Sequence, residues 1–276
     1  MTEIQSMAAL GEGNVRNEDL SLIPEAKATE AHILYDHGIP RLKSEIPPPT
    51  GHVTLVFTDI QNSTHLWEVN PGMHTAMELH NRLLRRQLRL CGGYEVKTEG
   101  DAFMCSFPNA LAAIWWCLSV QNGLLTEPWP LDILQSEEGK PVYNDVTGQL
   151  ISRGLSARMG VHCGLPVCKP DPITQRMDYF GPVVNCAARI SGAAASGQIL
   201  CSDEIVREIN VHISKQEPKT NHPPSDSPAV INGILRLGLE VVPIGALRLE
   251  GVGLIKNFSA IYPSGLQKRH NLTHTS

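Results

Sequence analysis

Two aspartates in this sequence stand at the ends of apolar, strand-forming runs, where a carboxylate can reach a ligand. Asp59 follows the run Val53–Thr58, and Asp101 opens a second run, Ala102–Phe107. Runs of this composition are typical of buried strands. Carboxylates held rigidly at neighbouring strand ends can share divalent cations, and Mg²⁺ prefers one or two carboxylates together with phosphate oxygens. The pair therefore indicates a divalent-metal site.

Each aspartate also has a purely structural explanation. Asp59 can cap the next helix through the N–H groups of Ile60 or Gln61, and Asp101 can cap its own backbone in a turn. Both residues nevertheless interrupt otherwise apolar strands. The hairpin that contains Asp101 can also pair beside the Asp59 strand, which is why we favour the metal site.

A second candidate site lies on a predicted helix that opens at Pro182. Asn185 and Arg189 are four residues apart, so their side chains project from one face of that helix. An amide beside a guanidinium, one turn from the start of a helix, suits a phosphate-bearing ligand. An exposed polar helix face explains the same spacing equally well, and spacing alone does not choose between the two.

The remaining hydrophobic pattern predicts the elements that position these residues. Residues 75–91 form an amphipathic helix that ends at Gly92-Gly93, and residues 94–107 form a hairpin with a glycine turn. Asn109 caps a helix over 110–121. Residues 154–164 form a buried strand, in which His162 is expected to be a hydrogen-bonded core histidine. Further elements are expected as strands at 198–201, 239–244 and 258–262, with a helix from 202 to about 210.

Polar and proline-containing segments set the expected limits of the domain. Residues 1–50 end in a triple proline and are interpreted as an extended lead-in or linker. The domain itself is expected to occupy residues 51–263, with polar insertions at about 126–152 and 211–235. Residues 264–276 are interpreted as a polar tail.

The composition is that of a soluble globular protein, with 276 residues of which 42% are hydrophobic and 18% charged. The net charge of -5 and the pI of about 6.1 argue against nucleic acid as a partner. The uncharged run 102–125 is split by Pro108-Asn109 into a strand and a helix shorter than the roughly 20 residues of a membrane span. We expect no membrane span and no secretion signal.

Cysteine usage points to a reducing compartment. The seven cysteines are odd in number and include no CxxC pair, and Cys163 and Cys168 have no matching His/Cys set in the sequence. This pattern predicts reduced, mostly buried thiols in a cytoplasmic protein, and neither a disulfide framework nor a zinc site.

Four motifs occur in an order that resembles one protein family. They are F-T-D-I (57–60), K-T-E-G-D (97–101), R-M-G-V-H-C-G (158–164) and D-Y-F-G-P-V-V-N-C-A-A-R (178–189). Together they resemble the class III nucleotidyl cyclase catalytic domain over roughly residues 51–263. The last motif and the run L-H-N-R-L-L-R-R-Q-L-R (79–89) most resemble the fungal, Ras-responsive adenylyl cyclases. The resemblance implies a ferredoxin-like α+β core and head-to-tail homodimers with active sites at the interface.

The resemblance also assigns roles to individual residues. Asp59 and Asp101, assisted by the backbone carbonyl of Ile60, correspond to the ligands of two Mg²⁺ ions, for which Mn²⁺ can substitute. The implied activity is an adenylate cyclase, a lyase that converts ATP to 3′,5′-cyclic AMP and diphosphate.

Four further residues are implied to act with the metal carboxylates of the other protomer. Asn185 and Arg189 correspond to residues that orient the ribose and stabilise the transition state. Lys97 and Asp178 correspond to the purine-selecting pair. Adenine presents an acceptor at N1 and a donor at its 6-amino group, which matches the donors of Lys97 and the acceptors of Asp178. Guanine has the opposite polarity on that edge, so a guanylyl cyclase is disfavoured.

Two departures from the family pattern leave an alternative open. Glu250 stands where relatives usually carry a lysine that touches the triphosphate, and Leu165 stands where some carry an arginine. Either Arg248 or Lys256 takes over the missing charge, or activity is reduced. The alternative is a catalytically weak or silent cyclase-like module for regulation or dimerisation. The resemblance further suggests a Ras-type regulator acting through a larger parent protein, which would hold this cytoplasmic domain near a membrane.

Overall fold

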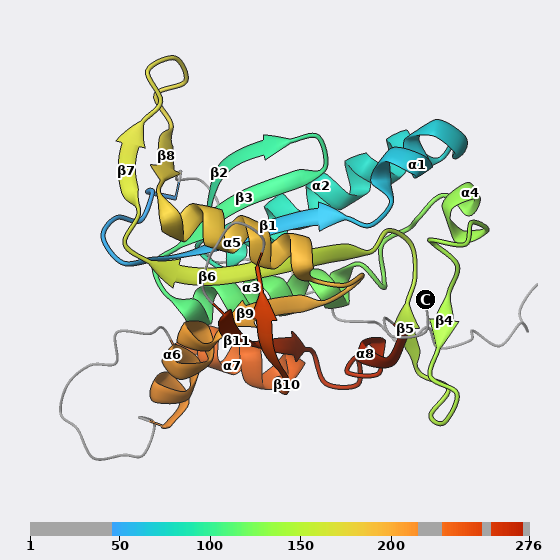
Figure 1. The fold of residues 1–276 in the computed structure, drawn as a ribbon. Helices are drawn as coiled ribbons and strands as arrows, with labels where there is room; N and C mark the ends of the chain where they lie inside the picture. The colour runs from blue at the N-terminus through green and yellow to red at the C-terminus, as the bar shows by residue number, and fades with distance from the viewer. Residues whose placement is uncertain (1–45, 215–227, 250–254, 273–276) are drawn as a thin grey trace, which may run out of the picture. The chain divides into compact units, whose positions relative to one another are not determined.

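The computed structural model describes residues 46–214, 228–249 and 255–272, with the side chains of 213, 214, 255, 256, 271 and 272 left out. Its centre is a seven-stranded sheet with the order β10-β11-β9-β6-β1-β3-β2 (Figure 1). Neighbouring strands are antiparallel except for β6 and β9, which run parallel. The strands are β1 Val53–Ile60, β2 Tyr94–Glu99, β3 Ala102–Phe107, β6 Ala157–Gly164, β9 Ile199–Ser202, β10 Glu240–Arg248 and β11 Ile255–Tyr262.

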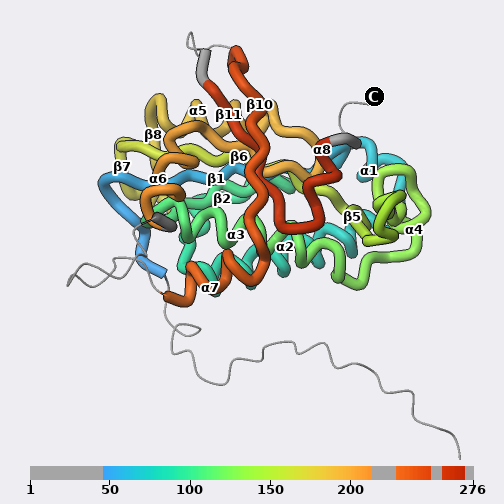
Figure 2. Tube along the Cα trace, turned by 90° about the horizontal axis from the view of Figure 1, so that it is seen from below, coloured from blue at the N-terminus to red at the C-terminus, as the bar shows by residue number. Residues whose placement is uncertain are grey.

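Helices cover both faces of this sheet. Figure 2 shows α5 (Pro182–Ala193) on one face and α2 (Met73–Leu90), α3 (Ala110–Gly123) and α7 (Pro228–Leu237) on the other. Helix α6 (Asp203–Ser214) shares the larger apolar core with α2 and α3. The predicted ferredoxin-like α+β fold is confirmed. The remaining elements are α1 Ser63–Val69, α4 Leu131–Leu134, α8 Arg269–Leu272, the pair β4 Val142–Tyr143 and β5 Leu150–Ser152, and the pair β7 Val167–Pro170 and β8 Met177–Phe180.

Strand alternation divides the interior into separate clusters. On β1, Val56 and Ile60 face the large core beneath α2 and α3, while Val53 and Leu55 face the α5 side. Both sets are almost completely buried, so β1 is apolar on both faces as a central strand must be. This burial fixes the register of β1, because a one-residue slip would exchange its two faces. The position of Asp59 is thereby fixed as well.

The predicted hairpin and the split of the uncharged run are both confirmed. Strands β2 and β3 pair across a turn at Gly100, whose φ of 64° lies in the left-handed region that glycine tolerates. Asn109 caps α3 by accepting a hydrogen bond from the Ala112 N–H at 2.9 Å. Helix α3 is buried on nearly all sides, and its Trp116 Nε1 donates to the Leu84 carbonyl at 3.1 Å. Within the described ranges, no helix combines the length and apolar character needed to cross a membrane.

The segment 126–152 contributes more to the core than its polar composition predicts. Trp129, Ile133 and Ile151 are buried, and the Trp129 Nε1 donates to the Leu124 carbonyl at 2.8 Å. A few large apolar side chains anchor an otherwise polar loop, and an averaged composition hides them. The polar insertion expected at about 126–152 therefore includes three buried apolar residues.

The second predicted insertion, 211–235, also contains regular structure. Helix α6 extends to Ser214 and not to about 210, and α7 begins at Pro228. Ile231 and Ile234 of α7 are buried in the large core, where α7 packs against α3. Their spacing of three residues places them on one helix face, a signal too short to stand out among the neighbouring prolines. Residues 215–227 lie outside the described part.

The prediction that most of the cysteines are buried is confirmed. All seven cysteines lie among the described residues and are free thiols. Six are buried, and Cys168 on β7 is half-buried. The buried thiols fill gaps between the sheet and its helices as small apolar side chains do.

Candidate functional site

The structure brings the carboxylates of Asp59 and Asp101 to neighbouring strand ends. Asp59 is the penultimate residue of β1, and Asp101 immediately precedes β3, which pairs with β1. The Ile60 N–H donates to Asp101 Oδ2 at 3.0 Å, so this carboxylate is tied directly to the end of the Asp59 strand. Both aspartates are half-buried and reach solvent. A pair of rigid, accessible carboxylates is the donor set that a hard divalent cation requires.

Arg158 is a member of this site that the sequence motifs left without a role. It lies opposite Asp59 in the β1–β6 register, and its Nε donates to Asp59 Oδ2 at 2.9 Å. Its Nη2 contacts the same oxygen. The Asp59 carboxylate thus already faces one positive charge, and a metal ion at Asp59 has to share the carboxylate with Arg158 or displace it.

The only sequence signal for this pairing is an arginine within an otherwise apolar strand. Arg158 stands in the motif that supplies β6, but nothing in the motif shows which residue of β1 lies opposite. That relation depends on strand register, which the local sequence pattern around Arg158 does not determine.

Lys97 on β2 of the seven-stranded sheet and Asp178 on β8 of the two-stranded β7–β8 sheet are brought together. Lys97 Nζ lies 3.0 Å from Asp178 Oδ2, and Asp178 Oδ1 accepts the N–H of Tyr179 at 2.8 Å. The pair lies at a cavity of about 390 Å³ bounded by β2, β8 and the turn between β7 and β8. This volume is within the roughly 300–1,000 Å³ of small-molecule pockets.

A β-bulge turns Lys97 toward this cavity. The register of β2 against β3 shifts between Glu95 and Lys97, so that Lys97 lies opposite Met104. Met104 packs in the apolar cluster that also contains Tyr179, the neighbour of Asp178. Without the extra residue, Lys97 would face the opposite side of the sheet.

The same hairpin separates the two pairs of residues. Lys97 is opposite Met104, whereas Asp101 precedes the first residue of β3. Three residues of strand correspond to about 10 Å. The carboxylate pair and the Lys97–Asp178 pair therefore mark two positions along one hairpin and not one point.

Asn185 and Arg189 lie on α5 as predicted, one helical turn apart. The helix begins at Pro182 after Gly181, whose φ of 110° makes a sharp entry that glycine tolerates. Asn185 is exposed and Arg189 is half-buried. Helix α5 packs directly on β6 and β1, the two strands that carry Arg158 and Asp59.

Only some of the residues at which the sequence departs from the family pattern lie in the described part of the chain. Leu165 follows β6 and is 71% exposed, and Arg248 is exposed near the end of β10. Glu250 and the side chain of Lys256 lie outside the described residues, so the question of which cation meets the triphosphate stays a prediction. The core role expected for His162 is confirmed, because its Nδ1 lies 2.8 Å from the buried Ser202 Oγ.

Comparison with known proteins places this geometry in one family. The model of the adenylate and guanylate cyclase catalytic domain matches residues 46–222. An adenylate cyclase of Mycosarcoma maydis is 66% identical over 174 residues, 63% of this chain and 7% of the relative. An adenylate cyclase of Neurospora crassa is 43% identical over 249 residues, 87% of this chain and 11% of the relative. The chain thus spans a small part of the length of the curated relatives it matches.

A solved structure agrees with the sequence comparisons. An adenylate cyclase of Trypanosoma brucei in its monomeric state is 27% identical, with a TM-score of 0.62. The match covers 79% of this chain and 91% of that chain. The matched family domain includes the strands and the helix that carry the seven predicted site residues. The chain therefore belongs to the adenylate and guanylate cyclase catalytic domain family.

Proposed function

We propose that this chain is an adenylyl cyclase, which converts ATP to 3′,5′-cyclic AMP and diphosphate. The proposal depends on one observation: Asp59 and Asp101 lie at adjacent strand ends, which are connected by the hydrogen bond from the Ile60 N–H to Asp101. The fungal relatives named adenylate cyclase support the same activity.

The residues at the strand ends fit a divalent metal, which class III cyclases generally use. Asp59, Asp101 and the Ile60 carbonyl would hold two Mg²⁺ ions, or Mn²⁺ in their place. The ions would lower the pKa of the ribose 3′-hydroxyl and neutralise charge on the triphosphate. Arg158 already contacts Asp59 Oδ2, so a metal ion would have to share that carboxylate with Arg158 or displace it.

Lys97 and Asp178 would read the adenine edge. Lys97 offers donors for N1, and Asp178 offers acceptors for the 6-amino group. The two side chains bond each other at 3.0 Å, and ATP has to replace that bond. The replacement costs little, because Lys97 is 44% exposed and exposed ion pairs contribute at most about 1 kcal/mol.

Asn185 and Arg189 would act on the reacting part of the nucleotide. Asn185 would orient the ribose, so that the 3′-hydroxyl points at the α-phosphorus. Arg189 would stabilise the charge that builds on the α-phosphoryl group during attack. Arginines in such positions contribute factors of about 10³–10⁵ in other phosphoryl-transfer enzymes.

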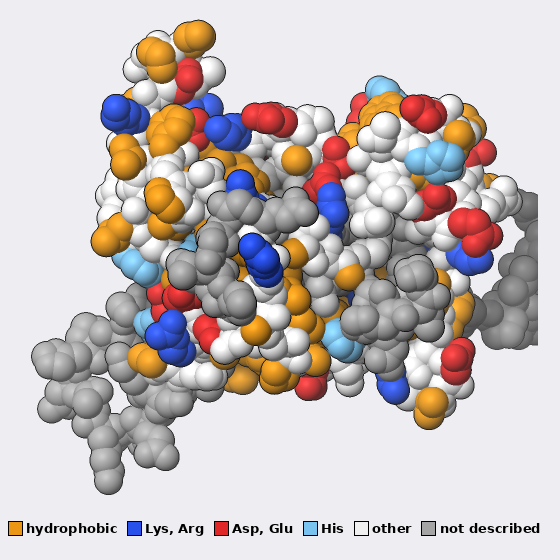
Figure 3. Space-filling model, viewed as in Figure 1, with side chains coloured by type: hydrophobic (Ala, Val, Ile, Leu, Met, Phe, Trp, Pro, Cys, Tyr) orange, Lys and Arg blue, Asp and Glu red, His pale blue; other side chains and the backbone are white. Residues whose placement is uncertain are grey.

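A second copy of the chain would complete each active site. The β7–β8 hairpin, which carries Asp178, exposes Val167, Ile173 and Phe180 to solvent, and Leu165 just before β7 is exposed as well. Figure 3 shows hydrophobic side chains, in orange, on the visible face of this hairpin. Exposed apolar side chains beside a ligand cavity favour an interface. A Ras-type regulator is supported only by the resemblance to fungal cyclases, of which the matched domain is a small part.

A cyclase assay with ATP and Mn²⁺ tests the proposal. Asp59→Ala and Asp101→Ala are expected to lower cyclic AMP formation by at least about a thousandfold while the protein remains folded, because the metal loses a ligand. Asp145→Ala, at an exposed turn between β4 and β5, is the matched control and should retain full activity. Equal activity in Asp59→Ala would refute the metal assignment. A wild-type chain that forms no cyclic AMP would favour the silent regulatory module.

A further inference from the structure

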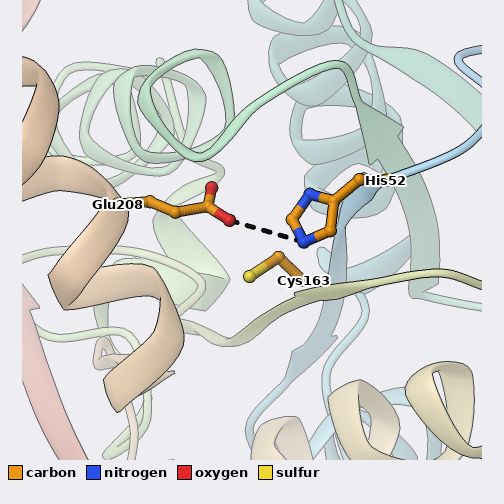
Figure 4. Close-up of side chains that lie close together, drawn as sticks. All are labelled: His52, Cys163 and Glu208. Atoms are coloured by element: carbon orange, nitrogen blue, oxygen red, sulfur yellow. Dashed lines mark ion pairs between the residues drawn. The ribbon is translucent and has the colours of Figure 1, made fainter.

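His52, Cys163 and Glu208 converge on one point away from the strand ends that carry Asp59 and Asp101 (Figure 4). One ligand-type atom from each residue lies within 4.8 Å of the others, and His52 Nε2 is 3.5 Å from Glu208 Oε1. The residues are separated by more than forty positions in the sequence. They come from the turn before β1, from β6 and from α6.

The fold itself brings these three residues together. Thr54 lies opposite Cys163 in the β1–β6 register, which places His52, two residues earlier, beside the Cys163 end of β6. Cys163 belongs to the core cluster on the α3 and α6 side of the sheet. Helix α6 packs on β6 and carries Glu208 toward the same spot.

A buried polar group beside the cluster lacks a partner. The Thr54 hydroxyl oxygen is buried and has no hydrogen-bond partner among the described residues. Buried hydroxyl groups are nearly always hydrogen-bonded, and an orphan often marks the place of a water or an ion. A water bound as an additional metal ligand would supply the missing partner.

We propose that His52, Cys163 and Glu208 form a zinc-type metal site with three protein ligands and an open fourth position. A thiolate, an imidazole and a carboxylate together suit Zn²⁺, whereas Mg²⁺ takes oxygen ligands. The site is therefore distinct in chemistry from the Asp59–Asp101 pair. A bound ion would link α6 and the residues just before β1 to the central strand β6.

The ligand atoms of His52, Cys163 and Glu208 are close enough together to bind one metal ion. Zinc ligands at about 2.0–2.3 Å from the metal lie about 3.5 Å from one another. The His52–Glu208 separation already has this value, and Cys163 Sγ lies within 4.8 Å of both ligand atoms. The His52 side chain is 52% exposed, so it has room to move.

Metal binding has to remove the proton of Cys163. Burial and the neighbouring Glu208 carboxylate raise the pKa of the Cys163 thiol. The proton leaves to solvent when the thiolate binds the metal, so binding is expected to weaken as the pH falls.

Co²⁺ and Zn²⁺ titrations of the metal-free full chain test the site. Co²⁺ should produce a thiolate-to-cobalt charge-transfer band that saturates at one equivalent. Zn²⁺ should raise Tm by roughly 5 °C at a hundredfold excess over its Kd, and Mg²⁺ should leave Tm nearly unchanged. Cys163→Ser should abolish the band, and His52→Ala and Glu208→Gln should weaken binding by at least about tenfold.

Matched variants separate this site from other thiols, imidazoles and carboxylates. Cys168→Ser removes a half-buried thiol outside the cluster, and His74→Ala removes an exposed histidine 4.0 Å from Glu78. Both should keep the band, as should Asp59→Ala, so the result does not depend on the proposed cyclase activity. The proposal is overturned if the wild-type chain gives no charge-transfer band. It is also overturned if His52→Ala, at an exposed position that the fold tolerates, binds Co²⁺ as tightly as wild type.

Discussion

Lys97 and Asp178 carry the proposed base specificity through hydrogen-bond polarity alone. Asp178 Oδ1 accepts a hydrogen bond from the N–H of Tyr179, which orients the carboxylate. Asp178 Oδ2 therefore remains to bind Lys97 or a base. Because one residue only donates and the other only accepts, their order around the cavity determines which purine edge fits.

Exchanging these groups should change the preferred nucleotide. In Lys97→Glu with Asp178→Cys, an acceptor replaces the donor, and a weak donor replaces the acceptor. Two mismatched hydrogen bonds to charged groups correspond to a fall of about a hundredfold in the ATP/GTP ratio of kcat/KM. Steady-state kinetics with both nucleotides measure the ratio, and Asp145→Ala serves again as the unaffected control. An unchanged ratio in the double variant would show that the pair does not read the base.

His80 should make the stability of the fold depend on pH. Burial lowers the pKa of His80 from 6.5 to about 4, against the raising effects of the Asn81 hydrogen bond and the charge on Asp101, while Arg85 adds to the lowering. The folded protein therefore keeps His80 neutral where the unfolded chain binds a proton. The free energy of unfolding is therefore unaffected by His80 above pH 6.5 and falls by about 3 kcal/mol as the pH drops to 4. Below pH 4 the contribution of His80 no longer changes.

Urea unfolding across this pH range checks the contribution of His80. His80→Gln should remove about 3 kcal/mol of the pH dependence of the unfolding free energy, whatever its effect at neutral pH. His74→Gln, at an exposed histidine, should leave the dependence unchanged. Parallel pH profiles for wild type and His80→Gln would contradict the assignment.

The sequence identified the types of the site residues better than their partners. Asp59 and Asp101 stood out because they interrupt apolar strands, and the structure places them together. Arg158 did not stand out, since its contact with Asp59 depends on the pairing of two strands 99 residues apart. The cluster of His52, Cys163 and Glu208 was missed for the same reason. Local spacing finds ligands on one element, whereas these ligands come from three.

Among the elements, α5 depends on a close approach to β6. A Cβ at Gly160 would lie 2.8 Å from the Ala187 carbonyl oxygen and still closer to the backbone of Ser191. Neither group can rotate away, because both belong to the backbone of α5. The absence of a side chain at this position lets α5 sit directly on the sheet and sets the place of Asn185 and Arg189.

Gly160→Ala should therefore impair both stability and activity. Displacing α5 is expected to cost about 1–3 kcal/mol, and moving Asn185 and Arg189 should lower kcat by at least about tenfold. Gly164→Ala on the same strand is the matched control, because its Cβ would meet only side-chain atoms of Val183. Denaturant unfolding and the cyclase assay measure both effects. Equal losses in the two variants would show that contact with the α5 backbone is not the cause.

Elements with strong local signals were predicted, and those that depend on tertiary contacts were not. The hairpin at Gly100 and the capped helix after Asn109 have turn and cap residues in the sequence itself. The bulge that aims Lys97 has no such residue, because it arises from the pairing of β2 with β3. Helix α7 was missed because its buried face consists of few residues next to a proline-rich stretch.

At the scale of the whole molecule, one chain carries two different parts of a site. The β1–β3 end presents the carboxylates, and β2, β8 and α5 present the groups proposed to bind the nucleotide. The exposed apolar side chains of the β7–β8 hairpin favour a partner surface next to the second part. A head-to-tail pair of chains would place the metal carboxylates of each protomer against the nucleotide-binding residues of the other.

Mixing two inactive variants tests this central claim most directly. Asp59→Ala with Asp101→Ala removes one part of the site, and Asn185→Ala with Arg189→Ala removes the other. Each double variant alone should form no measurable cyclic AMP. An equal mixture that exchanges subunits at random has one intact site in half of its dimers, so it should recover about a quarter of the wild-type activity. A mixture that remains inactive, although native mass spectrometry shows the mixed dimers, would contradict the shared active site.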